Sequence, residues 1–265
     1  MTAEIHASSV VHDGARIGAN VSIGPFCEVG ADVVLGDGVT LHGRVTLMGS
    51  VHLGVEVEVF PGATLGGKAQ SLGSKVEPDT GVVIGPRTIL RECVSIHAGS
   101  PKGTRYTRVG ADCFLMAYSH VGHDCQIGNH NVLANSVQFA GHITTGDHVW
   151  VGGSVAIHQF TEIGDHAFVA GGAILVGDVI PFGMVAGNRA SLKGLNIKGL
   201  SRRGFSRHQL HDLRRAYKAV FEGHGTFLER VSAAEERFVK DADAKKLFEF
   251  IRKDRSRALC LPDPS

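Results

Sequence analysis

Four histidines are spaced so that a fold with an 18-residue repeat would bring them to one edge: His120, His123, His142 and His158. Each lies within three positions of an apolar residue, and these residues (Val121, Phe139, Ile157) are 18 positions apart. Three neutral imidazoles with a water molecule make an open zinc site. Alternatively, one imidazole acts as a general base toward a hydroxyl group. The spacing therefore predicts a catalytic or metal-binding edge.

Two further residues could support such chemistry. Asp124 directly follows His123 and could orient it or stabilise its charge, although adjacent residues on a strand point to opposite sides. Gly141 precedes His142, and a glycine lets a substrate come close to the backbone. Its N–H group could then stabilise a developing oxyanion.

The elements that must hold these residues follow a six-residue period. Branched aliphatic residues occur at every sixth position from Ile5 to Leu65, and apolar residues do so again from Val109 to Leu175, where only Thr145 is polar. A helix of 3.6 residues per turn cannot keep such a stripe on one face. A β-sandwich would show turn signals at wider spacing. The period predicts a parallel β-helix with three hexads in each triangular coil, and it leaves the handedness open.

The hexad pattern also predicts the domain organisation. It is lost in two polar, Gly-rich stretches, near 66–83 and 97–108, which we expect to be loops. Loops on a rigid scaffold often carry function. The pattern ends after Leu175, so we expect a β-helix over 1–187, followed by a connector and a C-terminal helical domain over 188–265.

Helical periodicity appears in the C-terminal part. Ser206 is a candidate N-cap before one helix, and Thr226 with Glu229 forms a capping-box pattern before a second. A third helix is indicated by apolar residues near the end of the chain: Leu247, Phe250 and Ile251. The C-terminal helical domain should therefore contain three helices.

Composition excludes several classes of protein. A formal net charge of +1 argues against a general nucleic-acid binder. The five cysteines form no CxxC pair, and three of them occupy small interior positions of the repeat, which suits buried thiols in a reducing compartment. We expect neither a signal peptide nor a membrane span, because no suitable apolar stretch is present.

Four motifs together resemble one family. They are HVGHDC from His120, LANSVQFAGH ending at His142, AIHQF ending at Phe160, and NIKGLSRRGFS from Asn196. The set resembles the UDP-N-acetylglucosamine O-acyltransferases, the first enzymes of lipid A biosynthesis in Gram-negative bacteria. The resemblance implies a cytoplasmic homotrimer of left-handed β-helices with active sites between subunits. It also implies a 3-hydroxyacyl chain on acyl carrier protein as donor, the sugar 3-position of UDP-GlcNAc as acceptor, and no metal or diffusible cofactor.

The resemblance also implies roles for single residues. His123 is expected to be the general base, Asp124 its supporting partner and Gly141 the oxyanion donor. Gly171 is expected to let the acyl chain lie deep in its groove, so that a bulkier residue shortens the accepted chain. The expected substrate contacts are Gln70, His120, His142, His158 and Gln159. The expected nucleotide and carrier contacts are Asn196, Arg202 and Arg203, whose guanidinium groups suit a diphosphate.

Two departures from the family pattern keep an alternative acceptor open. Lys198 replaces an acidic residue, and the first loop reads Gln70-Ser71-Leu72-Gly73 with Lys75 beyond it, where the family has Gln-Asp-Leu-Lys. Changed polar contacts alter acceptor choice strongly. The acceptor could therefore be the 3-amino analogue of UDP-GlcNAc, which gives an amide.

Three more distant alternatives are proteins compatible with the same six-residue repeat. A γ-type carbonic anhydrase shares the fold and binds zinc through three histidines. The N-acyltransferase of the same pathway carries an additional N-terminal domain, for which a coil that starts at Ile5 leaves no room. A non-catalytic scaffold would not need four histidines on one edge.

Overall fold

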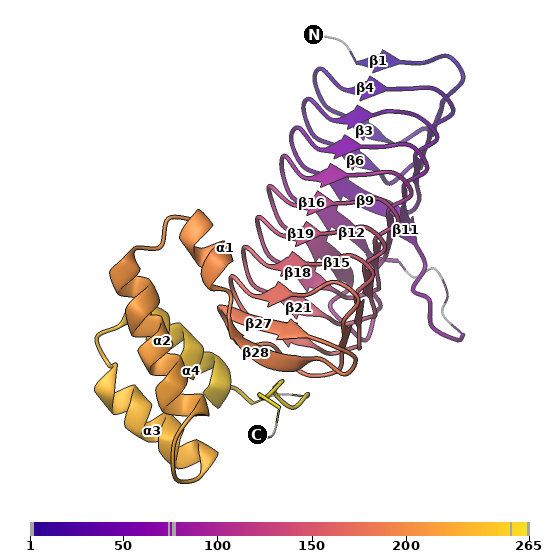
Figure 1. Cartoon of the computed structure of the whole chain (residues 1–265). Coiled ribbons are helices and arrows are strands. Elements are labelled where there is room, and N and C mark those ends of the chain that lie inside the picture. The colour runs from indigo at the N-terminus through magenta and orange to yellow at the C-terminus, as the bar shows by residue number, and fades with distance from the viewer. Residues whose placement is uncertain (1–2, 74, 76–77, 255, 264–265) are drawn as a thin grey trace.

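The computed structural model describes residues 3–73, 75, 78–254 and 256–263. Within these residues the chain first winds into a left-handed parallel β-helix, and helices follow it at the C-terminal end (Figure 1). The β-helix predicted from the six-residue period is thereby confirmed.

Each coil contributes one short strand to each of three sheets. Among the described residues, sheet A consists of β1 (Glu4–Ile5), β4 (Ser22–Ile23), β7 (Thr40–Leu41), β10 (Glu58–Val59), β13 (Ile89–Leu90), β16 (Phe114–Leu115), β19 (Val132–Leu133), β22 (Trp150–Val151), β25 (Phe168–Val169), β27 (Gly183–Ala186) and β28 (Ser191–Leu195). Sheet B consists of β2 (Val10–Val11), β5 (Glu28–Val29), β8 (Thr46–Leu47), β11 (Thr64–Gly67), β14 (Ser95–His97), β17 (His120–Val121), β20 (Gln138–Phe139), β23 (Ala156–Ile157) and β26 (Ile174–Leu175).

Sheet C forms the third side of the prism. It consists of β3 (Arg16–Ile17), β6 (Val34–Leu35), β9 (Ser50–Leu53), β12 (Gly81–Ile84), β15 (Tyr106–Val109), β18 (Gln126–Ile127), β21 (Thr144–Thr145) and β24 (Glu162–Ile163). Regular partners lie 18 residues apart, as when Ser22 pairs with Thr40. Three hexads therefore close one coil, as the sequence predicts.

The core fills the interior of the prism. The second residue of a typical strand points inward, and Val29, Leu47 and Val59 are fully buried there. Ile5 follows the same pattern but is 46 % exposed, because it belongs to the first coil and only one side of that coil is covered. The cysteines expected at small interior positions are buried: Cys27, Cys113 and Cys125.

Two segments leave the coil on the same side of the prism. The first lies between β11 and β12, and it stands out from the coil in Figure 1. The second lies between β14 and β15. Both follow strands of sheet B, whose register resumes after each of them, since Thr64 pairs with Ser95 and Ser95 pairs with His120. The two segments are therefore inserted at one corner of the prism without disturbing the stack.

The C-terminal part contains α1 (Ile197–Arg202), α2 (Arg207–Phe221), α3 (Phe227–Arg237) and α4 (Ala242–Arg252). Ser206 caps α2 and Thr226 forms a capping box with Glu229 at the start of α3, as predicted, and Ser206 also forms a capping box with Gln209. Two elements were not expected from the sequence, namely α1 and the antiparallel strand β28, which pairs with β27 and continues sheet A. Among the described residues, no helix has the length and apolar character needed to cross a bilayer.

Candidate active site

One corner of the prism carries a histidine, a glycine and a glutamine on three successive coils. We call the residues His123, Gly141 and Gln159 the groove corner. Backbone hydrogen bonds stack these turns, because His142 N–H donates to the His123 carbonyl at 2.9 Å and Phe160 N–H donates to the Gly141 carbonyl at 3.2 Å. The 18-residue spacing seen in the sequence thus brings these residues onto neighbouring rungs.

His123 and Asp124 face each other although they are adjacent in the chain. The His123 Nδ1 atom lies 2.8 Å from Asp124 Oδ2. Both residues belong to a turn and not to a strand, and the backbone of Asp124 adopts a left-handed φ of 63°. The sequence argument that neighbouring strand residues point apart therefore does not apply, because the corner folds the carboxylate back onto the ring.

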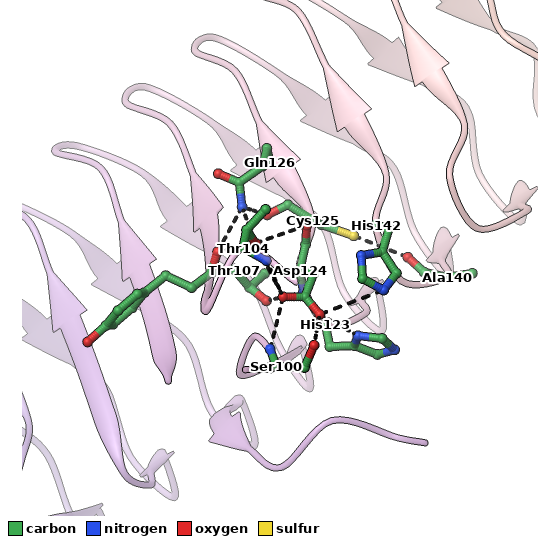
Figure 2. A network of polar contacts seen from close by, with 10 residues as sticks. Ser100, Thr104, Thr107, His123, Asp124, Cys125, Gln126, Ala140 and His142 are labelled. Atoms are coloured by element: carbon green, nitrogen blue, oxygen red, sulfur yellow. Dashed lines mark hydrogen bonds and ion pairs between the residues drawn. The ribbon is translucent and has the colours of Figure 1, made fainter. Parts of the chain in front are cut away.

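The second loop encloses the carboxylate of Asp124 (Figure 2). Ser100 donates its N–H to Oδ1 at 2.9 Å and its hydroxyl to Oδ2 at 2.7 Å. Thr104 donates its N–H to Oδ1 at 2.9 Å. A Cβ atom on Gly103 would lie 2.3 Å from Oδ1, so only a glycine fits there. Sequence analysis did not identify these loop residues, because nothing local links them to Asp124.

Hydrogen bonding fixes the charge of this carboxylate. The Asp124 side chain is fully buried, and burial opposes its ionisation. Hydrogen bonds from His123 and Ser100 outweigh that cost and hold the pKa of Asp124 below its ordinary value. The site therefore contains a buried, ionised carboxylate whose hydrogen bond directs the Nδ1–H of His123 inward, so that Nε2 remains for the groove.

Gly141 lies directly against the other nitrogen of this imidazole. A Cβ atom at position 141 would lie 2.7 Å from His123 Nε2. Among the described residues, no acceptor is found for the N–H of Gly141. A free donor beside the basic nitrogen is the arrangement needed to stabilise an oxyanion formed at that point.

His142 lies behind the pair. Its Nε2 atom is 3.8 Å from Asp124 Oδ2, and its ring packs edge-on against His123 and parallel to Phe160. Burial lowers the pKa of His142, although the Asp124 charge opposes this shift. The ring of His142 is therefore held neutral beside the ionised carboxylate.

The groove runs from this corner across the outer face of sheet B. The predicted site residues that line it are Gln70, His120, His123, Gly141, His158 and Gln159. Exposed Ala156 and Ile174 continue the groove as an apolar strip. Gly171 lies at the opposite edge of the same sheet, beside Gly153, whose carbonyl would be 3.3 Å from an added Cβ atom. A chain could therefore extend along sheet B from the polar corner towards Gly171.

His120 is held by a neighbouring strand and by a histidine that sequence analysis missed. Its Nδ1 atom lies 2.8 Å from Ser95 Oγ, and its ring packs edge-on against His97 at 5.2 Å. Burial lowers the pKa of His120 to about 4, so the ring is neutral near pH 7. His97 directly follows Ile96 of the apolar stripe, and this spacing could have identified it.

The remaining predicted contacts lie on a different face. Asn196, Arg202 and Arg203 line a hollow of about 740 Å³ over the outer side of sheet A, together with Trp150 and Phe168. A single chain thus separates the predicted site residues into two groups. Because the two groups line different hollows, one chain alone does not bring them together.

Two residues in this hollow also have structural contacts. Asn196 caps α1, since its side chain accepts the N–H of Gly199, and it donates to the His166 carbonyl at 2.9 Å. Arg203 donates to the His148 carbonyl at 2.9 Å. Burial lowers the pKa of Arg203. Arg202 is exposed.

The same corner also offers ligand atoms for a metal ion. Among the described residues, one group could hold an ion, with ligand atoms of His123, Asp124 and His142 within 4.8 Å of one another. In this group the carboxylate already accepts hydrogen bonds from Ser100 and Thr104. Within the described part of this single chain, no three histidines bring their ligand atoms together in this way. The arrangement fits a histidine activated by a carboxylate better than a zinc ion with an open position.

Comparison with known proteins agrees with this geometry. Residues 178–260 match the family described as UDP N-acetylglucosamine O-acyltransferase, domain 2, and residues 106–141 match the bacterial transferase hexapeptide repeats. The acyl-[acyl-carrier-protein]–UDP-N-acetylglucosamine O-acyltransferase of Sinorhizobium fredii is 42 % identical over 262 residues, which cover 99 % of this chain and 97 % of that protein. The enzyme of the same name from Campylobacter concisus is 41 % identical, over 93 % of this chain and 94 % of that protein.

Solved structures extend the likeness to three dimensions. The UDP-N-acetylglucosamine acyltransferase of Francisella novicida superposes with a TM-score of 0.93 at 33 % identity, over 98 % of this chain and 95 % of that one. The corresponding Arabidopsis acyltransferase superposes with a TM-score of 0.85 at 33 % identity, over 97 % of this chain and 99 % of that one. Because both the coil and the helices take part in these matches, the protein belongs to the family of UDP-N-acetylglucosamine O-acyltransferases.

Proposed function

We propose that the protein transfers a 3-hydroxyacyl chain from acyl carrier protein to the 3-hydroxyl of UDP-GlcNAc, the first step of lipid A biosynthesis. The single observation that supports this activity most strongly is the His123–Asp124 pair beside the free N–H of Gly141, at one end of an apolar groove. The names of the relatives supply the donor and the acceptor. The donor thioester is already activated, so the proposed reaction needs no metal or cofactor.

The proposed chemistry follows from the tautomer of His123. Because Nδ1–H donates to ionised Asp124, Nε2 has a free lone pair and removes the proton from the sugar hydroxyl. The oxygen attacks the thioester carbonyl, and the N–H of Gly141 stabilises the resulting oxyanion. When the C–S bond breaks, the imidazolium of His123 returns its proton to the leaving thiolate. Asp124 stabilises the imidazolium in between.

The other predicted polar residues in the groove and behind its corner are proposed as substrate contacts. Polar side chains suit the sugar and the donor's amide groups, and the members of this set are Gln70, His120, His142, His158 and Gln159. The apolar strip with Ile174 suits the acyl chain, and Gly171 leaves space at the end of it. In this proposal the size of residue 171 sets the accepted chain length.

The two separate groups of residues support a homotrimer with sites between subunits. Asn196, Arg202 and Arg203 lie over sheet A, away from the groove on sheet B, so a neighbouring copy is proposed to bring the two together. The arginines then contact the diphosphate or the acidic carrier protein. We propose that this trimer works in the cytoplasm.

A paired assay tests the proposal. Purified protein and 3-hydroxyacyl carrier proteins of several chain lengths are mixed with either UDP-GlcNAc or its 3-amino analogue, and products are identified by mass spectrometry. An ester formed with UDP-GlcNAc is expected. Product from the amine alone would contradict the proposed acceptor while leaving the acyl transfer intact. Absence of product in both arms, or activity abolished by a chelator, would contradict the proposed chemistry.

A further inference from the structure

The chain after α4 returns to the last coil of the β-helix. Asp178 donates its N–H to the Ala258 carbonyl at 2.8 Å and accepts the N–H of Cys260 at 2.8 Å. A Cβ atom on Gly177 would lie 2.6 Å from the Ala258 carbonyl oxygen, so the two segments are in close contact. We call residues 256–261 the C-terminal strap. Its backbone is fixed to the coil next to the groove corner.

The strap brings one cation onto a groove histidine. Arg257 Nη2 lies 2.5 Å from His158 Nδ1, and Arg257 Nε lies 3.0 Å from the Gln159 carbonyl oxygen. A guanidinium group has only donors and stays protonated. His158 Nδ1 must therefore be the acceptor. A neutral imidazole has one N–H, so the hydrogen of His158 is on Nε2.

The other tautomer also has a partner available. The Gln159 carbonyl oxygen lies 3.3 Å from His158 Nδ1 and could accept a hydrogen bond from an Nδ1–H group. Without Arg257, His158 could donate to that carbonyl, and Nε2 would become an acceptor. The strap residue thus decides whether the free nitrogen of a groove histidine donates or accepts. Among the described residues, none forms a hydrogen bond to His158 Nε2, which is therefore open to the groove.

We infer that Arg257 is a positioning residue for the acyl transfer, which fixes His158 as an Nε2–H donor toward a hydrogen-bond-accepting oxygen of the bound substrate. The inference rests on the proposed function for its substrate. Two substrates offer such an oxygen, since the donor carries carbonyl groups and the acceptor carries phosphate and sugar oxygens. Arg257 itself acts through His158, because its Nη2 contacts the ring and its Nε donates to the Gln159 carbonyl.

The test uses two substitutions at one position and a matched control. R257M removes every donor while keeping a long side chain, and R257K keeps a cationic donor. R252M removes an arginine that pairs with Glu235 on α3, away from the groove. R257M is expected to lower kcat/KM about tenfold, because His158 would lose its hydrogen bond to the substrate. R257K should lose less, and R252M should match the unchanged protein. A rise in KM for the nucleotide sugar or for the acyl carrier protein identifies the substrate that His158 contacts.

Two readouts separate positioning from a structural role. In ¹⁵N-histidine-labelled protein, with the His158 signals assigned by H158A, R257M should move the hydrogen from Nε2 to Nδ1. In the H158A background, R257M should cause no further loss of activity. An unchanged tautomer in R257M, or an equal loss in both backgrounds, would overturn the inference. If the unchanged protein forms no product, the proposed function fails, whereas the tautomer measurement still decides the role of Arg257.

Discussion

Two corners of the same prism have the same backbone, but their side chains differ in hydrogen bonding. At what we call the ladder corner (Asn129, Asp147, Asp165), each side chain accepts the N–H of the equivalent residue one coil earlier. Asn129 N–H donates to Asp147 at 2.7 Å, and Asp147 N–H donates to Asp165 at 3.0 Å. At the groove corner, His123, Gly141 and Gln159 occupy the same slot, and the N–H of Gly141 has no acceptor among the described residues.

The next slot differs in the same way. After the ladder corner, His130, His148 and His166 stack with rings nearly parallel, at centroid distances of 4.6 and 4.9 Å. After the groove corner, Asp124 replaces the first ring of such a stack and is enclosed by the second loop. At the ladder corner, side chains accept the backbone N–H groups of the neighbouring coil, whereas the groove corner leaves a donor and a basic nitrogen for a substrate. The difference lies in a few side chains and an inserted loop, not in the fold.

The largest effect is expected from removing the base at the groove corner. His123→Ala should lower turnover by about 10²–10⁴-fold, because His123 Nε2 is the proposed base for the acceptor's proton. His130→Ala, in the slot after the ladder corner, should leave turnover nearly unchanged. Both are measured as kcat, with circular dichroism and size-exclusion chromatography to verify the fold. Near-normal turnover in His123→Ala would show that His123 is not the general base.

A methyl group at the groove corner should be almost as damaging. In Gly141→Ala the added Cβ would lie 2.7 Å from His123 Nε2, so the ring must move away from the oxyanion donor. We expect turnover to fall by about 10²–10³-fold, the usual loss for one such donor. Gly43→Ala is the control, since it adds a methyl to a corner where Pro25 is the neighbour. Similar kinetics in both variants would argue against a special role for Gly141.

A third corner tests the length of the groove. Gly171→Met extends a side chain where an added Cβ meets only the backbone of Gly153 within 4 Å. The preference for long over short acyl chains should fall by about tenfold or more, as lost methylene contacts do in other pockets. Competition between carrier proteins of different chain length measures this ratio. If the ratio stays the same, the groove ends elsewhere.

A smaller effect is expected from the loop that encloses Asp124. Ser100→Ala removes the hydroxyl that donates to Oδ2 and should lower turnover about two- to tenfold, the net effect of one ordinary hydrogen bond. The pKa of Asp124 is held below its ordinary value, so its charge is lost only as the pH falls through that low pKa. Losing a donor raises this pKa. The acid limb of the pH–turnover profile should therefore move to higher pH.

The matched control for the loop is an exposed serine at another corner, Ser154→Ala. It should leave the pH profile of turnover in place. If the acid limb of Ser100→Ala also stays at the same pH, the loop does not control the pKa of Asp124.

The smallest effect on activity is expected at the ladder corner. Asp147→Ala removes the acceptor for the N–H and the side-chain amide of Asn129. This should cost about 1 kcal/mol of stability and lower the thermal midpoint by a few degrees. Turnover should be unchanged. A loss of turnover without a loss of stability would reverse the contrast between the two corners.

Much of the fold could be predicted because a β-helix repeats its local rules. The six-residue stripe identifies the inward positions, and even Thr145, its polar exception, is buried and accepts a hydrogen bond from Asn131 at 2.8 Å. The stripe could not indicate that β28 turns back antiparallel or that α1 precedes the three expected helices. Neither element follows the repeat.

The site could be predicted where spacing alone decides proximity. His123, Gly141 and Gln159 meet because they are 18 residues apart. The orientation of Asp124 was misjudged, because the corner slot imposes a left-handed φ that a strand does not have. Ser100 and Arg257 were missed because they lie 24 and 99 residues from their partners, respectively, in segments that leave the repeat. No local pattern encodes such contacts.

The regular register of the first coils has an evolutionary consequence. Ser22, Thr40 and Glu58 occupy equivalent places in sheet A, and no residue proposed for the reaction lies between them. Duplicating or deleting one complete coil there, for example residues 22–39, would keep every remaining strand in step with its neighbour. The prism can therefore change length by whole turns during evolution without altering its chemistry. A shorter insertion in these coils would have to leave the coil as a loop, as the two segments after strands of sheet B do.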